Sequence, residues 1–318
     1  MNVSLWPNMK SKQEESIATE LSKLGYARLV HRFTNLSYLS IWMHYIRSDS
    51  ISRVSLSDGS VLEKIQLNIL ANLLILLQSR WKIVSQESNL LYVRNEGGIT
   101  IACRTDKGAD TGNIVWIFVK QVYGQDFKGK NVVDIGMSNG DSSIYFAFQG
   151  AKRVIGFEPF EESYDLAISN IQKSGLGHAI EPFKMAVTTR SGTTNLFVYE
   201  NRPTDNSVDF ENMVHSKRDM TSKTVPGISL SEVIDMFKGE NIDFLKMDCE
   251  GCEYGVLRSL EQSKFDKIYR IALEYHNGPQ ELPDLLNSKG FKINIFGNPK
   301  NIGYIIAYKM NSPSLPPL

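Results

Sequence analysis

The spacing of apolar positions is helical from Ser11 to Arg80. Apolar residues recur there at intervals of three and four, which is the spacing of one helix face. The residues that define three helices are Ile17, Leu21 and Leu24 before Gly25, the aromatic-rich stretch Tyr26–Ile46, and the stripe Leu62, Ile65, Ile69 and Leu73 that ends near Leu77. We therefore predict a helical N-terminal region over residues 1–90, which could cover a ligand site or make a homo-oligomer contact.

A different pattern begins at Leu90. Two apolar runs flank Gly97 and Gly98 in "LLYVRNEGGITIACR", which predicts a β-hairpin, and "TGNIVWIFVKQVYG" predicts a helix after it. We place the start of a second domain here, over residues 91–312, and a flexible tail over residues 313–318.

Strand-like and helix-like segments then alternate to the end of the chain. The strand-like segments are "NVVDIG", "RVIGFEP", "AIEPFKMAVT", "TTNLFVYE", "IDFLKMD", "IYRIALEYH", "FKINIFG" and "IGYIIAYKM", with helices between most of them. This alternation predicts an α/β fold with a doubly wound, mostly parallel sheet. The loop Asn298–Asn301 is too short for a helical crossover, so the last strand must run antiparallel. Residues 201–227 are polar without a period, which predicts a long loop that could close over a ligand.

The charge and cysteine content narrow the setting of the protein. Thirty-five basic residues balance thirty-five acidic ones, so composition gives no support for nucleic-acid binding or for an anionic membrane surface. The longest apolar run, Leu67–Leu77, is well short of the roughly 20 residues that span a bilayer, and the N-terminus lacks a secretory signal pattern. Three cysteines suit a reducing compartment better than a disulfide framework. We expect a cytoplasmic protein without a membrane span.

A loop between two strand-end acids is the first candidate for chemistry. In "NVVDIGMSNGDSSIYFAFQGAKRVIGFEPF", Asp134 ends one strand, Gly136 and Gly140 follow it, and Glu158 ends the next strand. A dinucleotide site would need Gly-x-Gly-x-x-Gly, but Ser138 and Asp141 occupy two of those glycine positions, and no P-loop sequence follows a strand. Glu158 could accept hydrogen bonds from a ribose diol. Two acids without a phosphate site point to a nucleoside that is not a phosphate ester, and S-adenosylmethionine is the commonest such cofactor.

Acidic residues also follow two later strands. "LKMDCEGCEYG" places Asp248, Glu250 and Glu253 after one strand, and "IALEYHNG" places Glu274 and His276 after the next. His276 is the natural general base because the ordinary pKa of histidine is near neutrality, and Asp248 could share that role or hold an acceptor hydroxyl.

These residues leave two alternatives open. Asp248, Glu250 and His276 could instead ligate a divalent cation, for which magnesium would suit the oxygen ligands, although we do not favour a metal. The lone C-x-x-C of Cys249 and Cys252 disfavours zinc, and we expect two small buried residues or helix-start thiols there. Glu253 is expected on a solvated helix face.

Several segments together resemble one family. "VVDIGMSNGDSS", "GFEPFEESYDLAISNI", "KMAVT", "ISLSEVI", "IDFLKMDCEGCEYGVL" and "IALEYH" are similar to the FkbM family of S-adenosylmethionine-dependent methyltransferases over about residues 110–310. The resemblance implies a seven-stranded class I methyltransferase sheet and O-methylation of a hydroxyl on a small molecule, a glycan or a polyketide-like acceptor. The cofactor contacts that it implies are Asp134, Gly136, Met137, Ser138, Asn139, Gly140, Glu158, Pro159, Met185, Ala186 and Asp248, and the catalytic candidates are His276, Asp248, Glu250 and Glu274.

Two departures from the family pattern bear on function. The region before residue 90 is not part of the family core, and Ser138 replaces the small apolar residue or glycine that is common in the first loop. The alternatives to an O-methyltransferase are a non-catalytic binding or assembly module on the same fold, and an RNA methyltransferase, which would need a basic face.

Overall fold

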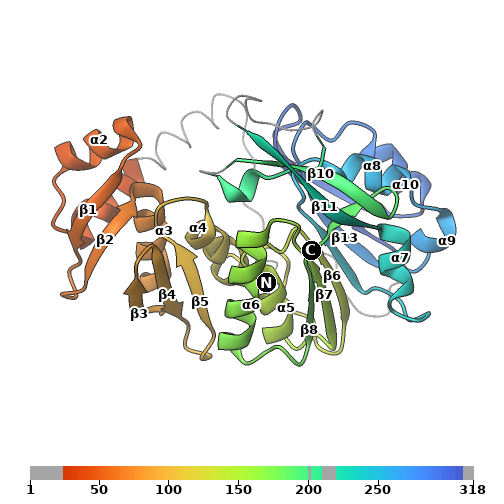
Figure 1. The fold of residues 1–318 in the computed structure, drawn as a ribbon, viewed down its shortest axis with the longest axis horizontal. Coiled ribbons are helices and arrows are strands. Elements are labelled where there is room, and N and C mark those ends of the chain that lie inside the picture. The colour runs from red at the N-terminus through yellow and green to blue at the C-terminus, as the bar shows by residue number, and fades with distance from the viewer. Residues whose placement is uncertain (1–23, 200–201, 210–219, 311–318) are drawn as a thin grey trace. The chain divides into compact units, whose positions relative to one another are not determined.

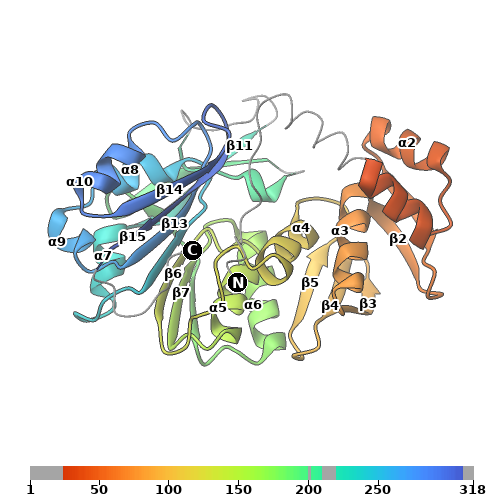
Figure 2. The same ribbon diagram turned by 180° about the vertical axis from the view of Figure 1, so that it is seen from behind.

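The computed structural model describes residues 24–199, 202–209 and 220–310, and divides the chain into two compact units, Met1–Val122 and Tyr123–Leu318. Figures 1 and 2 show the two units from opposite sides. The boundary between these units lies between Val122 and Tyr123, later in the chain than the predicted division between residues 90 and 91. The predicted helix at Ile17 and Leu21 and the tail over residues 313–318 lie outside the described residues.

The first unit mixes helices with short antiparallel strands. After a helical stretch over residues 24–33 come α2 (Tyr38–Arg47), the hairpin β1 (Ser50–Ser55) and β2 (Val61–Gln66), and α3 (Leu67–Gln78). The sheet β3 (Lys82–Glu87), β4 (Leu90–Arg94) and β5 (Thr100–Arg104) follows, with α4 (Asp110–Ile114) and a π-helix (Val115–Val119).

Two expectations for this unit have different outcomes. The hairpin around Gly97 and Gly98 is confirmed as β4 and β5, with Arg94 opposite Thr100. The helix expected through Leu62 and Ile65 is wrong, because both residues are buried in strand β2 and only the later part of the stripe is helical. The turn at Asp58 and Gly59, where Gly59 has φ +90°, reverses the chain and sets up pairing instead of a helix.

The second unit is built on a seven-stranded sheet in the order β14-β15-β13-β12-β6-β7-β8. Its strands are β6 (Asn131–Ile135), β7 (Arg153–Phe157), β8 (Ile180–Phe183), β12 (Phe244–Met247), β13 (Arg270–Tyr275), β14 (Lys292–Gly297) and β15 (Gly303–Tyr308). Neighbours pair in parallel except where β15 lies between β13 and β14, and both of its pairings are antiparallel. The predicted mostly parallel class I methyltransferase sheet with an antiparallel last strand is therefore confirmed.

Helices cover both faces of this sheet (Figure 1). On one face are α5 (Asp141–Phe148) and α6 (Glu161–Ser174); on the other are α7 (Leu230–Asp235), α8 (Cys252–Arg258), α9 (Gln262–Phe265) and α10 (Leu282–Ser288). Alternate residues of a strand point to opposite faces. Val133, Leu245 and Leu273 accordingly pack with the second group of helices.

A smaller sheet takes up part of the segment that was expected to be a loop. Its order is β10-β11-β9, formed by β9 (Ala186–Thr188), β10 (Gly192–Val198) and β11 (Thr221–Ser229). β11 pairs antiparallel with β10 over seven residues, so the loop prediction for residues 201–227 is wrong from Thr221 onward. A 3₁₀ turn spans Pro203–Asp205, and residues 201 and 210–219 lie outside the described residues.

Candidate functional site

The site lies where the loops after β6 and β12 leave adjacent strands for opposite faces of the sheet. The loop after β6 leads into α5 on one face, and the loop after β12 leads into α8 on the other. The amide of Asp248 donates to the carbonyl of Ile135 at 3.0 Å. Ligands of doubly wound sheets bind at this kind of switch point, beyond the carboxyl ends of the strands.

Two glycines shape the first loop for protein packing. Gly136 has φ +77°, and a Cβ there would lie 1.8 Å from the carbonyl oxygen of Asp248. Gly140 has φ +85° and would place a Cβ 3.2 Å from Ala167 of α6. The lack of a side chain at Gly140 therefore allows the close contact with Ala167 of α6.

Asp134 is fully buried and ties the loop to the sheet. Its Oδ2 accepts hydrogen bonds from the hydroxyls of Ser142 and Ser143, both at 2.6 Å. Its Oδ1 lies 3.3 Å from the Nζ of Lys246 on the adjacent strand β12. These contacts show that Asp134 orients the first loop.

Lys246 is a buried residue that the sequence did not single out. Its side chain is 4% exposed, and its Nζ donates to the carbonyls of Gly136 at 2.5 Å and Ile135 at 3.3 Å. Burial alone would lower the pKa of Lys246, but the charges of Asp134 and Asp248 outweigh it and raise the pKa. Lys246 lies opposite Asp134 in the strand register, which places both side chains on the α5 face of the sheet. A lone charged residue in an otherwise apolar strand was the feature of the sequence that could have identified Lys246.

Glu158 connects the end of β7 to the first loop. It is 8% exposed, and its carboxylate accepts from the amide of Ser138 at 3.0 Å and from that of Phe160 at 2.8 Å. The Oγ of Ser138 is buried without a hydrogen-bond partner among the described residues. A buried hydroxyl beside a strand-end carboxylate fits a polar ligand such as a ribose at this position.

The remaining cofactor candidates differ in burial and in position. Met137 is fully buried, and its side chain packs inward near Gly156. Asn139 is buried, and its carbonyl accepts from Asn170. Pro159 is half-buried after β7. Met185 follows the carboxyl end of β8, and Ala186 is the first residue of β9.

The second group of candidates meets around His276, which is 3% exposed. From its Nε2 to the nearest carboxylate oxygen the distance is 3.2 Å for Glu250, 3.7 Å for Glu274 and 3.8 Å for Asp248. The four predicted catalytic residues therefore lie together at the ends of β12 and β13, as expected for parallel neighbours.

Burial and mutual repulsion alter the proton affinities in this group. Burial raises the pKa of Glu250 to about 7 against the opposing effect of His276. Burial and then the charge of Asp248 raise the pKa of Glu274 to about 8. Burial would lower the pKa of His276, but Glu250, Glu253 and Asp248 together hold it well above its ordinary value. The near-neutral pKa that suggested His276 as the base therefore does not apply in this arrangement.

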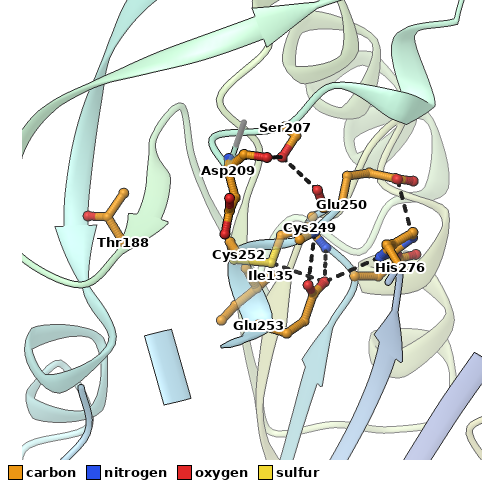
Figure 3. The surroundings of a disulfide bond; sticks show 12 residues. Ile135, Thr188, Ser207, Asp209, Cys249, Glu250, Cys252, Glu253 and His276 are labelled. Carbon is orange, nitrogen blue, oxygen red and sulfur yellow. Dashed lines mark hydrogen bonds and ion pairs between the residues drawn. A yellow bond between two sulfur atoms is a disulfide. The ribbon is translucent and has the colours of Figure 1, made fainter. Parts of the chain in front are cut away.

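Glu253 caps the loop that carries Glu250. It is fully buried, and its carboxylate accepts from the amides of Cys249 at 2.8 Å and Gly251 at 2.9 Å (Figure 3). An acidic group at the start of α8 also interacts favourably with the helix dipole. The expectation of a solvated helix face was wrong, because the carboxylate turns back to the loop amides.

Cys249 and Cys252 form a disulfide across the same loop, with 5.5 Å between their Cα atoms (Figure 3). The expectation of free thiols is therefore wrong, and the cysteine count no longer supports a reducing compartment. The disulfide closes a turn in which Glu250 has φ 58° and Gly251 has φ 117°, a conformation that is costly for glutamate. The hydroxyl of Ser207 donates to the carbonyl of Glu250 at 2.6 Å and holds the turn from the other side.

Reducing this disulfide is expected to lower the unfolding free energy of the second unit by about 2 kcal/mol, the loop-entropy value for so short a closed loop. Urea unfolding with and without a dithiol reductant measures the change, and hydrogen exchange under the same two conditions shows whether α8 is affected. The double variant Cys249→Ser and Cys252→Ser should show the lower stability and no response to reductant. An unchanged wild-type transition, with both thiols confirmed free by mass spectrometry, would rule out a stabilising disulfide.

No helix among the described residues is long and apolar enough to cross a membrane. Comparison with known proteins then gives the family. The family model described as "Methyltransferase FkbM domain" matches residues 134–293, which include both strand-end groups.

Individual relatives are distant. The chain is 26% identical over 161 residues to "Uncharacterized protein 158B" of Sulfolobus islandicus rod-shaped virus 1, covering 51% of this chain and 70% of that protein. It is 22% identical over 190 residues to "Methyltransferase sdnD" of Sordaria araneosa, covering 51% and 73%. A crystal structure of methyltransferase FkbM from Methylobacillus flagellatus KT is 18% identical with a TM-score of 0.39, covering 57% of this chain and 44% of that chain.

The family match takes in the loop after β6, Glu158 at the end of β7, and the acids and histidine after β12 and β13. S-adenosylmethionine is the methyl donor that this family implies. The chain belongs to the FkbM family of S-adenosylmethionine-dependent methyltransferases.

Proposed function

We propose that this protein transfers the methyl group of S-adenosylmethionine to a hydroxyl oxygen of a small molecule, a glycan or a polyketide-like acceptor. The observation that carries the proposal is the cluster of His276 with Asp248, Glu250 and Glu274, beside the first loop at the switch point. An alcohol must lose a proton when its oxygen becomes an ether, and carboxylates within reach of the acceptor can accept it.

The cofactor would lie over the loop after β6. Glu158 would accept from a ribose diol, and the Oγ of Ser138, buried without a partner among the described residues, would meet a polar ligand group. Bound there, the cofactor supplies an electrophilic methyl group on a sulfonium. The protein then has to align the acceptor oxygen and remove its proton.

Exposure supports Glu250 as the proton acceptor. The side chain of His276 is 2% exposed and lies behind the carboxylates, while those of Glu250 and Asp248 are 20% and 34% exposed. We assign proton removal to Glu250, positioning of the hydroxyl to Asp248, and orientation of Glu250 to His276. Each of these groups was a catalytic candidate from the sequence, which favoured His276 as the general base; we propose Glu250 in that role instead.

The test uses S-adenosylmethionine labelled in the methyl group and a panel of hydroxylated small molecules, glycans and polyketides, with amine analogues as controls. Label should enter an alkali-stable ether, and Glu250→Gln should lower kcat at least about 100-fold while changing cofactor affinity little. Labelling of amine analogues alone, or full activity of Glu250→Gln, would contradict the proposal. The matched control is Glu232→Gln on α7, which lies away from the cluster.

A further inference from the structure

Three atoms of metal-ligand type converge at the ends of β12 and β13. They come from Asp248, Glu274 and His276, and one ligand atom of each lies within 4.8 Å of the other two. Pairing of Leu245 with Ile271 and of Met247 with Leu273 fixes the register of the two strands and brings these residues to the same edge. The sequence had suggested Glu250 in place of Glu274.

The distances in this group exceed hydrogen-bond length. Nε2 of His276 is 3.8 Å from Asp248 and 3.7 Å from Glu274, beyond the usual limit for an N–H···O bond. Ligand atoms roughly 2.1 Å from one cation are separated by about 3.0 Å when adjacent and about 4.2 Å when opposite in octahedral geometry. The two separations from Nε2 of His276 lie between these limits, and the three ligand atoms lie within 4.8 Å of one another, so a small shift of the carboxylates brings all three to one cation.

The histidine is a second observation that points to a ligand. It is 3% exposed, its Nε2 lies 3.2 Å from Glu250 and faces Asp248 and Glu274, and its Nδ1 has no hydrogen-bond partner among the described residues. A buried imidazole aimed at two converging carboxylates is a ligand arrangement, whereas a cluster of acids alone would not be.

The local charge balance supports the same reading. Four carboxylates surround His276, those of Asp248, Glu250, Glu253 and Glu274. Among the described residues, Lys246 lies 3.9 Å from Asp248 but already contacts Asp134. A cation bound among these carboxylates would offset the repulsion between their charged forms.

We propose that Asp248, Glu274 and His276 bind one divalent cation of the Mn²⁺ or Zn²⁺ class. A mixed set of imidazole nitrogen and carboxylate oxygen suits these ions better than Ca²⁺, which takes six to eight oxygen ligands. The inference that a cation binds here depends only on these three residues and not on the proposed function. The role of the cation, which is to bind and polarise the acceptor oxygen, rests on the proposed function. Nε2 of His276 then ligates the cation in place of its 3.2 Å contact with Glu250, and Glu250 still takes the proton.

The test is Mn²⁺ binding to the full-length protein after chelator treatment, measured by electron paramagnetic resonance of free Mn²⁺ and by calorimetry. Wild type should bind one Mn²⁺ per chain with micromolar affinity. Glu274→Gln and Asp248→Asn should each weaken binding at least tenfold, whereas Asp284→Asn on the exposed side of α10 should not. Circular dichroism verifies folding of each variant, and two ligand variants keep the test decisive if one does not fold.

Three results would overturn the cation site. They are no Mn²⁺ bound by wild type, wild-type Mn²⁺ affinity in both Glu274→Gln and Asp248→Asn, or a loss of affinity in Asp284→Asn as large as in those two variants. Titration of S-adenosylmethionine into the same chelated samples separates this outcome from failure of the proposed function. Cofactor binding without Mn²⁺ binding would contradict the cation site alone. Mn²⁺ binding without cofactor binding would contradict the proposed methyl transfer but not the cation site.

Discussion

Replacing Lys246 by methionine is expected to lower the unfolding free energy of the second unit by about 3–5 kcal/mol, the cost of leaving a buried charge without its partner. Asp134 would keep only its hydrogen bonds from Ser142 and Ser143 while remaining fully buried. The carbonyls of Ile135 and Gly136 would also lose their donor. Because those carbonyls begin the cofactor loop, affinity for S-adenosylmethionine should fall together with stability.

Urea unfolding followed by hydrogen exchange in β6 and β12 measures this loss. Lys152→Met, which breaks the exposed ion pair with Glu240, is the matched control and should have little effect. Adding Asp134→Asn to Lys246→Met should recover part of the stability, since the uncompensated charge is then removed. If Lys246→Met were within 1 kcal/mol of wild type, this ion pair would not hold the loop.

Replacing Asp110 by alanine is expected to destabilise the first unit by a similar amount, about 3–5 kcal/mol. Asp110 and Arg104 are 0% and 1% exposed, and the carboxylate accepts from the guanidinium at 2.7 and 2.9 Å and from the amide of Arg104 at 2.8 Å. The variant would leave the arginine charge buried and break the link between β5 and α4.

Hydrogen exchange resolved by segment measures this effect, with faster exchange expected in β4, β5 and α4. Glu96→Gln, which breaks the exposed Arg80–Glu96 pair, should change stability by no more than about 0.5 kcal/mol. Normal protection of β5 in Asp110→Ala would show that the buried pair contributes little.

Periodicity predicted the second unit well because its signals are local. Alternating strands and helices, the short loop Asn298–Asn301 and the two strand-end acid groups were enough to predict the mixed sheet and to bring Asp248 and His276 together. The first unit was less predictable. Leu62 and Ile65 fit a helical stripe as well as a strand, and only pairing with β1 decides between them.

The interactions that hold the site could not be predicted in the same way. The contact of Lys246 with Asp134 depends on register between strands that are more than a hundred residues apart in sequence. Glu253 turned inward because unpaired loop amides lie beside it, and the Cys249–Cys252 disulfide depends on a left-handed turn at Glu250. Sequence patterns identify which residue types follow a strand, but not which of them point at each other.

The most direct test of the central claim is calorimetric titration of S-adenosylmethionine into wild type, Glu158→Ala and the exposed control Glu161→Gln, with NAD as a second ligand. The account predicts micromolar binding to wild type and Glu161→Gln, a large loss in Glu158→Ala, and no binding of NAD. Absence of S-adenosylmethionine binding to wild type, or equal binding to Glu158→Ala, would contradict a cofactor site between β6 and β7.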